Sequence, residues 1–471
     1  MNVNYPFLKS ALTEQNPFIS TEETMVWLSE QNKKIEVQIH KIRFDQLDQW
    51  FFNKERGLLQ HQTGKFFTIE GIQVDTNWGK VPTWQQPIIN QPEIGYLGII
   101  TKEINGILYF LLQAKVEPGN VNNVQLSPTL QATRSNYSQV HKGKKPLYLE
   151  YFVNATSEQI LLDQLQSEQG ARFLKKRNRN IIIKVDFNVP QQENFVWLTL
   201  GQIKKLIAYD NLVNMDTRTV ISGISFGEVG DEIFNFYTSI SSLFDQSSYE
   251  NKMLRSTLDS SSSLYSFDEI LNWFTALKCS YDLDLKPVSI FETKNWEITD
   301  SEIVHVDQNY FKVIATKVSI SNREVFRWTQ PLIEPMQEGL IAFLAKEING
   351  VYHFLIQAKL ECGNFDILEM APTVQCLTGS YKNSKDLDFL NEVLSAKQEN
   401  IIFDSMQSEE GGRFYKEQNR NVIIEVDDDF STDVPDNFIW VTLHQLNMFI
   451  KFNNYLNIQS RSLLSAISFI K

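Results

Sequence analysis

The sequence predicts an α+β protein built as a tandem duplication of two similar domains. Two long stretches recur without a gap: residues 101–137 match residues 345–381 at 17 of 37 positions, and residues 163–185 match residues 404–426 at 14 of 23. Each copy combines apolar runs that are typical of strands with helix-capping patterns. Repeats of roughly 200 residues are tandem domains, because solenoid repeats are far shorter.

Three segments divide the chain. Residues 1–244 form the N-terminal repeat, and residues 264–471 form the C-terminal repeat. Between them, residues 245–263 are polar and rich in serine, which is typical of a linker. The chain of 471 residues exceeds what a single hydrophobic core usually serves.

The first elements follow from capping and alternation. Ser20 and Glu23 have the spacing of a capping box, which predicts a helix from Thr21 to about Asn32. Apolar and polar residues alternate over residues 35–44, which predicts a strand. A pair of strands is expected over residues 58–74.

A hairpin is the clearest local signal. Two apolar runs within residues 99–115 flank Asn105-Gly106, and both turn residues tolerate the positive φ that a tight hairpin needs. Asn349-Gly350 repeats the signal in the second half. Further along, residues 147–153 predict a strand and residues 157–165 predict a helix.

The apolar residues 181–185 predict another strand. A second capping box, Thr199 with Gln202, predicts a helix that runs to about Tyr209. Its equivalent in the second half is Thr442 with Gln445. The box therefore belongs to the repeated unit.

Composition limits the class of protein. Hydrophobic residues make up 42% and charged residues 21% of the chain, as in an ordinary globular protein, and the formal net charge of −13 argues against nucleic-acid binding. Three cysteines imply no disulfide framework, and neither CxxC nor HExxH occurs. We see no signal-peptide pattern and no apolar run long enough to span a membrane, so we expect a cytoplasmic protein.

A polar stretch, residues 113–137, lies between apolar runs and recurs as residues 357–381. A hydrophobic core has no need of its amides, hydroxyls and charges, whereas a site for a polar ligand has. The second copy replaces Arg134 with Thr378. Elsewhere, Asp216 aligns with Gln459. We therefore expect the N-terminal repeat to be catalytic and the C-terminal repeat to be a catalytically inactive structural domain.

Several common motifs are absent or misleading. There is no GxxxxGK[ST] or GxGxxG phosphate cradle, and no Nudix pattern of clustered glutamates that would hold Mg²⁺. The match of residues 223–227 to G-x-S-x-G is a chance match, since the first glycine becomes Ala466 in the repeat.

The charged and aromatic candidates each have a structural alternative. Arg172 favours a buried or ligand-binding role, whereas Arg179, close to other basic residues, fits a solvated face equally well. Trp84 and Tyr137 have the ring to stack on a base or a sugar, but lone aromatic residues more often belong to the core.

The polar stretches resemble the NDP-hexose 2,3-dehydratase family of deoxysugar biosynthesis. The motifs that carry the resemblance are FLLQAKVEPGN (110–120), LSPTLQATRSNY (126–137), LQSEQGARFLKKRNRN (165–180) and NMDTRTVISG (214–223). The resemblance extends over essentially the whole chain, including the duplication.

The resemblance implies a nucleotide-linked 4-keto-6-deoxyhexose as the substrate, typically dTDP-4-keto-6-deoxy-D-glucose. It implies loss of water across C2 and C3 to an enol that tautomerises to a 3,4-diketo sugar, which a partner 3-ketoreductase then reduces. It also implies a homodimer, a Nudix-like fold in each half, and chemistry without a metal or other cofactor. The alternatives are a Mg²⁺-dependent nucleotide-diphosphate hydrolase of the same fold and a non-catalytic nucleotide-sugar-binding protein.

Within this resemblance, the candidate bases are Glu117, Glu168 and Asp216, with Asp216 preferred because the second half lacks it. Tyr137 is the candidate acid, and Lys115 or Asn136 are candidates to polarise the C4 oxygen. Arginines are candidates for the diphosphate, namely Arg134, Arg172 and Arg218. The other candidate substrate-binding residues are polar or aromatic: Trp84, Gln113, Asn120, Thr129, Gln131, Ser135, Gln166, Ser167, Arg179, Asn180 and Asn214.

Overall fold

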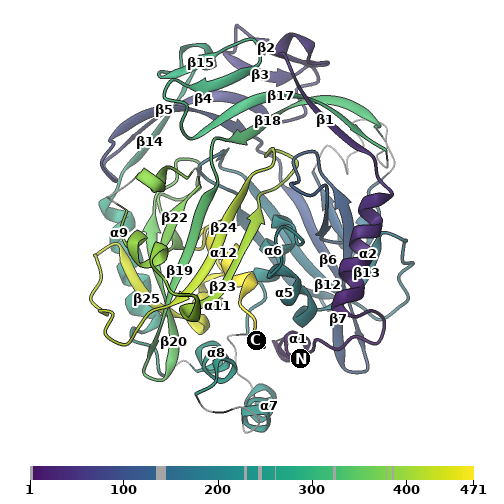
Figure 1. Ribbon diagram of the computed structural model, residues 1–471, viewed down its shortest axis with the longest axis vertical. Helices are drawn as coiled ribbons and strands as arrows, with labels where there is room; N and C mark the ends of the chain where they lie inside the picture. Colours follow the sequence, from purple (N-terminus) through teal and green to yellow (C-terminus); the bar gives the residue numbers. More distant parts are fainter. Residues whose placement is uncertain are drawn as a thin grey trace.

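The computed structural model describes residues 4–133, 145–226, 231–241, 245, 247–259, 261–321, 325–377, 379–383 and 387–470. Each half contributes a lower sheet and an upper sheet, and helices lie between the two lower sheets (Figure 1). The structure is therefore an α+β protein. No helix among the described residues is long and apolar enough to cross a membrane.

The lower sheet of the first half has strand order β10-β12-β6-β7-β13, with β8 paired to β7 and β9 paired to β6. Only the β12–β6 pairing is parallel. The bounds of these strands are β6 (Gly95–Ile104), β7 (Ile107–Val116), β8 (Val124–Ser127), β9 (Leu130–Ala132), β10 (Ile160–Ser167), β12 (Arg177–Val185) and β13 (Phe195–Thr199).

The lower sheet of the second half repeats this arrangement, with order β23-β24-β19-β20-β25 and with β21 and β22 paired to β20 and β19. The same parallel pairing recurs between β24 and β19. The bounds are β19 (Gly339–Ile348), β20 (Val351–Lys359), β21 (Glu369–Pro372), β22 (Val374–Cys376), β23 (Ile401–Ser408), β24 (Gln418–Glu425) and β25 (Phe438–Thr442).

Each upper sheet contains one strand from the other half. Strand β1 of the first half pairs antiparallel with β17, and β14 of the second half pairs antiparallel with β4. Figure 1 shows the purple β1 beside the green β17. The bounds are β1 (Val37–Ile42), β2 (Trp50–Asn53), β3 (Leu58–His61), β4 (Thr68–Thr76), β5 (Thr83–Asn90), β11 (Phe173–Leu174), β14 (Leu283–Val288), β15 (Trp296–Ile298), β16 (Glu302–His305), β17 (Phe311–Ile320) and β18 (Arg327–Pro335).

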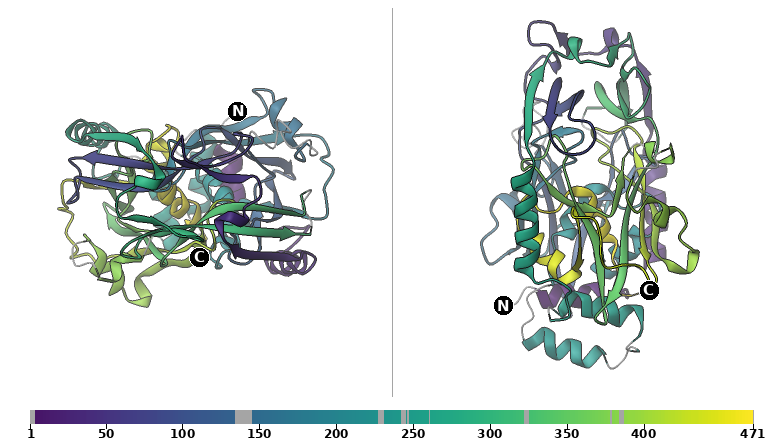
Figure 2. Two further views of the ribbon diagram at one scale, coloured as in Figure 1. Left: turned by 90° about the horizontal axis from the view of Figure 1, so that it is seen from above. Right: turned by 90° about the vertical axis from the view of Figure 1, so that its left-hand side faces the viewer.

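The helices pack between and around the lower sheets. Helices α6 and α12 contact each other where the halves meet, and α2 and α9 lie at opposite corners when the molecule is seen from above (Figure 2). The bounds are α1 (Asn4–Ala11), α2 (Thr21–Lys33), α4 (Leu149–Val153), α5 (Leu200–Ile207), α6 (Met215–Ser222), α7 (Asp231–Ser241), α8 (Tyr249–Leu258), α9 (Phe267–Ser280), α10 (Leu390–Leu394), α11 (Leu443–Phe449) and α12 (Ile458–Ala466). One hydrophobic core contains buried residues of both halves.

Most of the local predictions are confirmed. The capping boxes at Ser20, Thr199 and Thr442 begin α2, α5 and α11. The hairpin β6–β7 turns at Asn105 and Gly106 with φ of 53° and 77°, as the Asn-Gly signal predicts.

Two local predictions are wrong, and tertiary contacts explain both. Residues 149–153 are the helix α4 instead of a strand, since Leu149 and Phe152 lie three residues apart and are both buried. Phe152 packs over Gly98, where an added Cβ would lie 2.5 Å from its ring. Residues 160–167 are the strand β10 instead of a helix, because the ladder with β12 satisfies their backbone.

The segment that we predict as the linker contains α8. This helix occupies the place that α1 has in the first half. Ser10 Oγ accepts a hydrogen bond from Leu200 N at 2.9 Å, and Ser256 Oγ accepts one from Leu443 N at 3.0 Å. Ser10 thus holds the start of α5, and Ser256 holds the start of α11 in the same way. The domain boundaries remain a prediction.

Candidate active site

Asp216 lies in the first turn of α6, and Asn214 fixes that turn. The Asn214 side chain caps the helix by accepting a hydrogen bond from Thr217 N at 2.9 Å. Its Nδ2 donates to Ser127 Oγ of β8 at 2.9 Å. Helix α6 therefore begins against the end of the lower sheet, and Asp216 is 2% exposed there.

Around this helix start lies a group of side chains that we name the first polar cluster: Lys115, Glu117, Gln131, Asn214 and Asp216. Lys115 Nζ is 3.2 Å from Glu117 Oε1, and Gln131 Nε2 donates to the same oxygen at 2.8 Å. Asn214 Nδ2 lies 3.4 Å from Gln131 Oε1. The second carboxylate oxygen of Glu117 is buried and accepts no hydrogen bond from the described residues. An unsatisfied buried oxygen of this kind suits a ligand that donates a hydrogen bond.

The second half completes the first polar cluster through one loop. Gly119 N donates to Gly411 O at 2.7 Å, and Lys416 N donates to Gly119 O at 2.7 Å. These bonds bring Glu410 and Arg413 to the cluster. Glu410 Oε1 accepts a hydrogen bond from Gly412 N at 2.8 Å.

Arg413 is held close to Glu410. Its Nη1 donates to Gly412 O at 2.9 Å, and its Nε donates to Gln91 Oε1 at 3.2 Å. The guanidinium lies 4.3 Å from the centre of the Phe67 ring. The first polar cluster is therefore built by both halves.

Burial and like charges favour the protonated carboxyl groups here. Burial raises the pKa of Asp216 well above its usual range, and the negative charges of Glu410, Glu117 and Glu168 add to this shift. Burial, with the charge of Glu117, raises the pKa of Glu410 to about 7. Groups that titrate near neutral pH are suited to proton transfer.

A second polar cluster has the same architecture in the other half: Lys359, Glu361, Gln375, Asn457 and Gln459. Gln375 Nε2 donates to Glu361 Oε1 at 2.8 Å, and Asn457 Nδ2 donates to Gln375 Oε1 at 2.7 Å. Gln459 stands where the first cluster has Asp216, and both of its amide atoms are buried with no hydrogen-bond partner among the described residues.

Arg172 lies at the second polar cluster. Gly363 N donates to Gly170 O at 2.8 Å, which brings the loop of the first half across to the second. The Arg172 guanidinium is 4.1 Å from the centre of the Phe311 ring. Burial lowers the pKa of Arg172, and the nearby Glu417 and Glu361 partly oppose this shift. Arg413 takes the equivalent place at the first cluster.

Comparison with known proteins identifies the family. The family model described as NDP-hexose 2,3-dehydratase matches residues 21–224 and again residues 267–467. The chain belongs to the NDP-hexose 2,3-dehydratase family. The protein is therefore an enzyme of this family, and the two matched segments correspond to its two halves.

Three relatives share the name dTDP-4-dehydro-6-deoxy-alpha-D-glucopyranose 2,3-dehydratase. The relative from Saccharopolyspora spinosa is 45% identical over 469 residues, which cover 98% of this chain and 94% of the relative. The relative from Amycolatopsis orientalis is 38% identical, with 98% and 92% covered. The one from Streptomyces violaceoruber is 36% identical, with 94% and 95% covered.

Some of the sequence-predicted residues hold the two halves of the enzyme together. Arg218 is fully buried, and its Nη1 donates to Ser462 Oγ at 2.6 Å while its Nη2 donates to Ser408 O. Gln166 Nε2 donates to Ile450 O at 2.9 Å. These side chains face the interface between the halves.

Ser167 also contacts the second half, because its Oγ donates to Glu369 Oε2 at 2.8 Å. Glu168 follows it and accepts a hydrogen bond from Asn178 Nδ2 at 2.6 Å. Burial raises the pKa of Glu168, and the charges of Arg461 and Lys176 oppose this. Glu168 is close enough to raise the pKa of Asp216, so it lies between the interface and the first cluster.

Asn120 and Asn180 each have an unsatisfied buried oxygen. Asn120 Nδ2 donates to Asn123 O at 2.8 Å, and its Oδ1 accepts no hydrogen bond from any residue that the structure describes. An added Cβ on Gly411 would lie 2.2 Å from that Oδ1, so Asn120 borders the loop of the second half. Asn180 Nδ2 donates to Asn178 O at 3.1 Å.

Four further candidates either lie away from the first polar cluster or form hydrogen bonds or ion pairs that support the fold: Arg179, Thr129, Gln113 and Trp84. Arg179 forms an ion pair with Asp163, and Arg420 with Asp404 repeats it in the second half. Thr129 Oγ1 accepts a hydrogen bond from Ile100 N at 2.9 Å and so supports the sheet. Gln113 is half-buried on β7, opposite Ser127 and Phe195 of the neighbouring strands.

Trp84 is the fourth of these candidates. Its Nε1 donates to Gln86 Oε1 at 2.9 Å, and Gln86 Nε2 donates to Ala171 O, beside Arg172. Trp84 is thereby tied to the loop at the second cluster. By the same pattern, Trp328 bonds to Gln330, which donates to Gly412 O at the first cluster.

Four candidates lie outside the described residues: Arg134, Ser135, Asn136 and Tyr137. Sequence reasoning missed Glu410 and Arg413, because it searched only the first half for the working site. The repeat alignment contained the signal, since Glu410 aligns with Gln169. The second half has therefore gained a carboxylate at one position and lost one at another.

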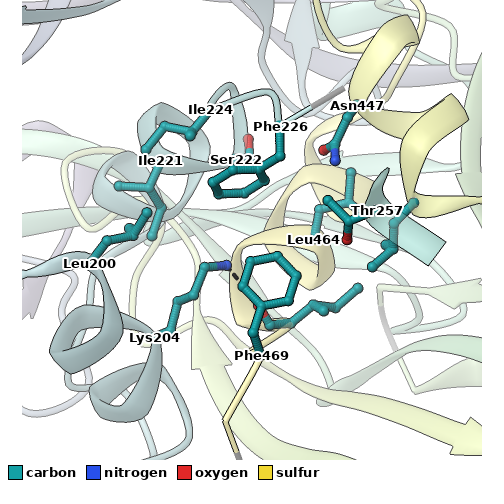
Figure 3. A pocket seen from close by; sticks show the side chains of 12 residues that line it. Leu200, Lys204, Ile221, Ser222, Ile224, Phe226, Thr257, Asn447, Leu464 and Phe469 are labelled. Atoms are coloured by element: carbon teal, nitrogen blue, oxygen red, sulfur yellow. Dashed lines mark hydrogen bonds between the residues drawn. The ribbon is translucent and has the colours of Figure 1, made fainter. Parts of the chain in front are cut away.

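A small pocket lies at the far end of α6, between the halves (Figure 3). Its volume of about 20 Å³ suits a single water molecule, and apolar side chains form most of its lining. Lys204 is buried there, its Nζ donates to Ile467 O at 2.7 Å, and burial lowers its pKa to about 7. The pocket contains none of the predicted site residues. Within the described part of the chain, no group of three or more His, Cys, Asp or Glu residues has the arrangement of a metal site.

Proposed function

We propose that this enzyme removes water across C2 and C3 of dTDP-4-keto-6-deoxy-D-glucose, at the first polar cluster. The names of the three relatives support this substrate. The observation that carries the location is the buried carboxyl of Asp216, where the second cluster has Gln459. An amide is neither an acid nor a base near neutral pH, so Gln459 cannot supply the proton transfer that a carboxyl group can.

The reaction requires groups that the first polar cluster contains. The C4 ketone acidifies the C3 proton, so a carboxylate is sufficient as the base. The C2 hydroxyl then leaves from the β position, which requires a proton donor. Lys115, 13% exposed in its side chain, is placed beside Glu117 as a cation to stabilise the enolate oxygen that develops at C4.

The remaining roles follow from the same cluster. Asp216, Glu117 and Glu168 are the proposed carboxyl groups for proton transfer, and Asn120, Gln131 and Asn214 are the proposed hydrogen-bonding partners of the sugar. Tyr137, Asn136 and Ser135 remain candidates for substrate contact, and Arg134 remains the candidate for the diphosphate. Arg172 and Arg218 are less suited to that role, because Arg172 lies at the second cluster and Arg218 donates its hydrogen bonds to Ser462 and Ser408 of the other half.

We extend the proposal to the assembly and pathway. Each half is proposed to have a Nudix-like fold, in keeping with its mixed sheet and flanking helices. The enzyme is proposed to act as a homodimer. The enol product tautomerises to an unstable 3,4-diketo sugar, so a 3-ketoreductase is the proposed next enzyme.

The test is a coupled assay. The purified enzyme is incubated with dTDP-4-keto-6-deoxyglucose, EDTA, a 3-ketoreductase and NADPH, and the product is analysed by mass spectrometry. We expect loss of one water followed by reduction, without added metal. The Asp216→Asn variant should lower kcat by about 10²–10⁴-fold.

The outcomes separate the alternatives. Release of a nucleotide monophosphate that requires Mg²⁺ would indicate a hydrolase instead. Binding of nucleotide-linked keto sugars without any turnover, for every nucleotide tried, would indicate a non-catalytic binding protein. Wild-type turnover by Asp216→Asn would contradict the proposed role of this carboxyl.

A further inference from the structure

The two polar clusters differ by a reciprocal exchange of carboxyl and amide groups. The first cluster has Asp216 on α6 and Glu410 on the crossing loop. At the matching positions, the second cluster has Gln459 and Gln169, and all four of their amide atoms are buried without a hydrogen-bond partner in the part of the chain that the structure describes. Two positions from opposite halves therefore carry carboxyl groups together at one cluster and amides together at the other. A loop with only a structural role would not require two carboxyl groups at one cluster and two amides at the other.

Gly412 allows the Glu410 carboxylate to face the first cluster. An added Cβ at Gly412 would lie 2.2 Å from Glu410 Oε1, and Glu117 Oε1 is 3.7 Å from the same point. The Glu410 and Glu117 carboxylates thus approach the same point beside Gly412. The matching residue at the second cluster is Ala171, which follows Gly170 and Gln169. Of the two clusters, the first thus combines a glycine at this position with a carboxylate two residues earlier, and the second combines an alanine with an amide.

The charges around the two carboxyl groups differ. Asp216 faces the negative charges of Glu410, Glu117 and Glu168, and the cations that oppose them include Lys115 and Arg218. Glu410 also faces Glu117 and Glu168, but it accepts the hydrogen bond of Gly412 N and lies near Arg413 as well as Lys115. Each carboxyl has a lysine and an arginine near it, but of the two only Glu410 accepts a hydrogen bond from a backbone N–H of the described residues, and such a bond stabilises the carboxylate. If the pair holds one proton, that proton therefore resides on Asp216.

We propose that Glu410 is the catalytic base of the reaction and that Asp216 is the matching acid, so that the C-terminal repeat supplies a catalytic residue to the site of the N-terminal repeat. This assignment rests on the proposed 2,3-dehydration. The comparison of the two repeats alone favours Asp216 as the base, whereas this proposal makes Asp216 the acid.

The proposed dehydration is balanced in protons and electron pairs. The Glu410 carboxylate takes the C3 proton, and the electron pair of the C3–H bond forms the enolate with oxygen at C4. The enolate then restores the C4 ketone, the C2–C3 double bond forms, and the C2–O bond breaks. The departing hydroxide takes the proton of Asp216 and leaves as water. Glu410 ends protonated and Asp216 ionised, and exchange with solvent restores both after product release.

Hydrogen exchange at C3 separates the two roles. Wild type, Glu410→Gln and Asp216→Asn are incubated with dTDP-4-keto-6-deoxyglucose in D₂O, and both dehydration and deuterium at C3 of the remaining substrate are measured by NMR. We expect both variants to lose about 10²–10⁴-fold in dehydration. We expect Asp216→Asn to retain C3 exchange, since its base is intact, and Glu410→Gln to lose it.

Folding and binding are controlled in the same variants. Gln keeps the acceptor for Gly412 N, and Gln169 shows that an amide fits this loop, so dTDP affinity and Tm should be close to those of wild type. Gln169→Ala at the second cluster is the matched control and should leave dehydration within about twofold. Gly412→Ala is a second variant, which should displace the Glu410 carboxylate and slow dehydration together with C3 exchange.

Each other outcome is decisive. Full activity of Glu410→Gln, or C3 exchange that persists in it, would overturn the base assignment. Loss of C3 exchange in Asp216→Asn would overturn the acid assignment. A wild-type enzyme that neither dehydrates nor exchanges any nucleotide-linked 4-keto sugar would instead refute the proposed function.

Discussion

At the residue scale, the two halves use similar side chains under different electrostatic demands. Ser408 Oγ donates to Gln125 Oε1 at 3.0 Å, and Ser167 Oγ donates to Glu369 Oε2 at 2.8 Å in the equivalent place. Burial raises the pKa of Glu369 to about 8, although the charge of Arg461 opposes the shift. The serine hydroxyl therefore donates to a neutral amide in one half and, in the other half, to a carboxyl whose ionised form is destabilised by burial.

We predict that Glu369→Gln removes a pH-dependent loss of stability. The folded pKa lies above the unfolded value, so the folded state binds the proton more tightly, and stability falls as the pH rises from about 4.5 to about 8. Wild type should lose on the order of a few kcal/mol over this range through this group. Urea unfolding of both proteins at pH 5 and pH 8 measures this.

The two proteins should be similar at pH 5, and the variant should be more stable at pH 8. Glu22→Gln is a suitable control, because Glu22 is exposed on α2. An equal decline in stability from pH 5 to pH 8 for wild type and Glu369→Gln would contradict the prediction.

At the element scale, glycine loops hold each cluster to the opposite half. An added Cβ on Gly119 would lie 1.6 Å from Phe414 O, and one on Gly363 would lie 1.8 Å from Phe173 O. Both contacts are with backbone, which cannot swing aside as a side chain can. The close approach of the two loops is therefore possible only with glycine.

We predict that Gly119→Ala lowers the free energy of unfolding by roughly 3–5 kcal/mol and reduces activity, because the loops must separate to admit the methyl group. Gly64→Ala is the control: no atom lies within 4 Å of its added Cβ, and its φ of 64° costs about 1–2 kcal/mol of backbone strain. Chemical denaturation and a dehydration assay measure both effects. Equal destabilisation by the two substitutions would refute the close-packing argument.

At the scale of the whole molecule, the halves are one cooperative unit. Strands β1 and β14 each pair with a sheet of the other half, and the largest core contains residues of both. Separating the halves would leave β17 and β4 as unpaired edges and would uncover apolar surface. It would also split the first polar cluster from Glu410.

We predict that fragments 1–244 and 245–471 aggregate or remain unfolded when expressed separately and recover activity when expressed together. The full chain should unfold in one transition by tryptophan fluorescence and by circular dichroism. Two separate transitions, or a monomeric fragment with its own cooperative unfolding, would contradict this.

Much of the fold could be predicted from local signals. The capping boxes and the Asn-Gly turns specify their own geometry through bonds between near neighbours, so α2, α5 and the hairpin β6–β7 follow directly from the sequence. The strand predicted for residues 147–153 and the helix predicted for residues 157–165 are wrong, because partners far along the chain decide the conformation of these segments. Short segments of this kind have little periodicity of their own.

The sequence by itself determined the duplication, the family, and the contrast between Asp216 and Gln459, because these depend only on residue order. Only the tertiary structure decided which loop serves which cluster. Arg172 lies at the second cluster, and Glu410 with Arg413 completes the first, since each loop crosses to the opposite half. Each loop crosses because of contacts between residues roughly 200 to 300 positions apart, and no local sequence pattern predicts such contacts.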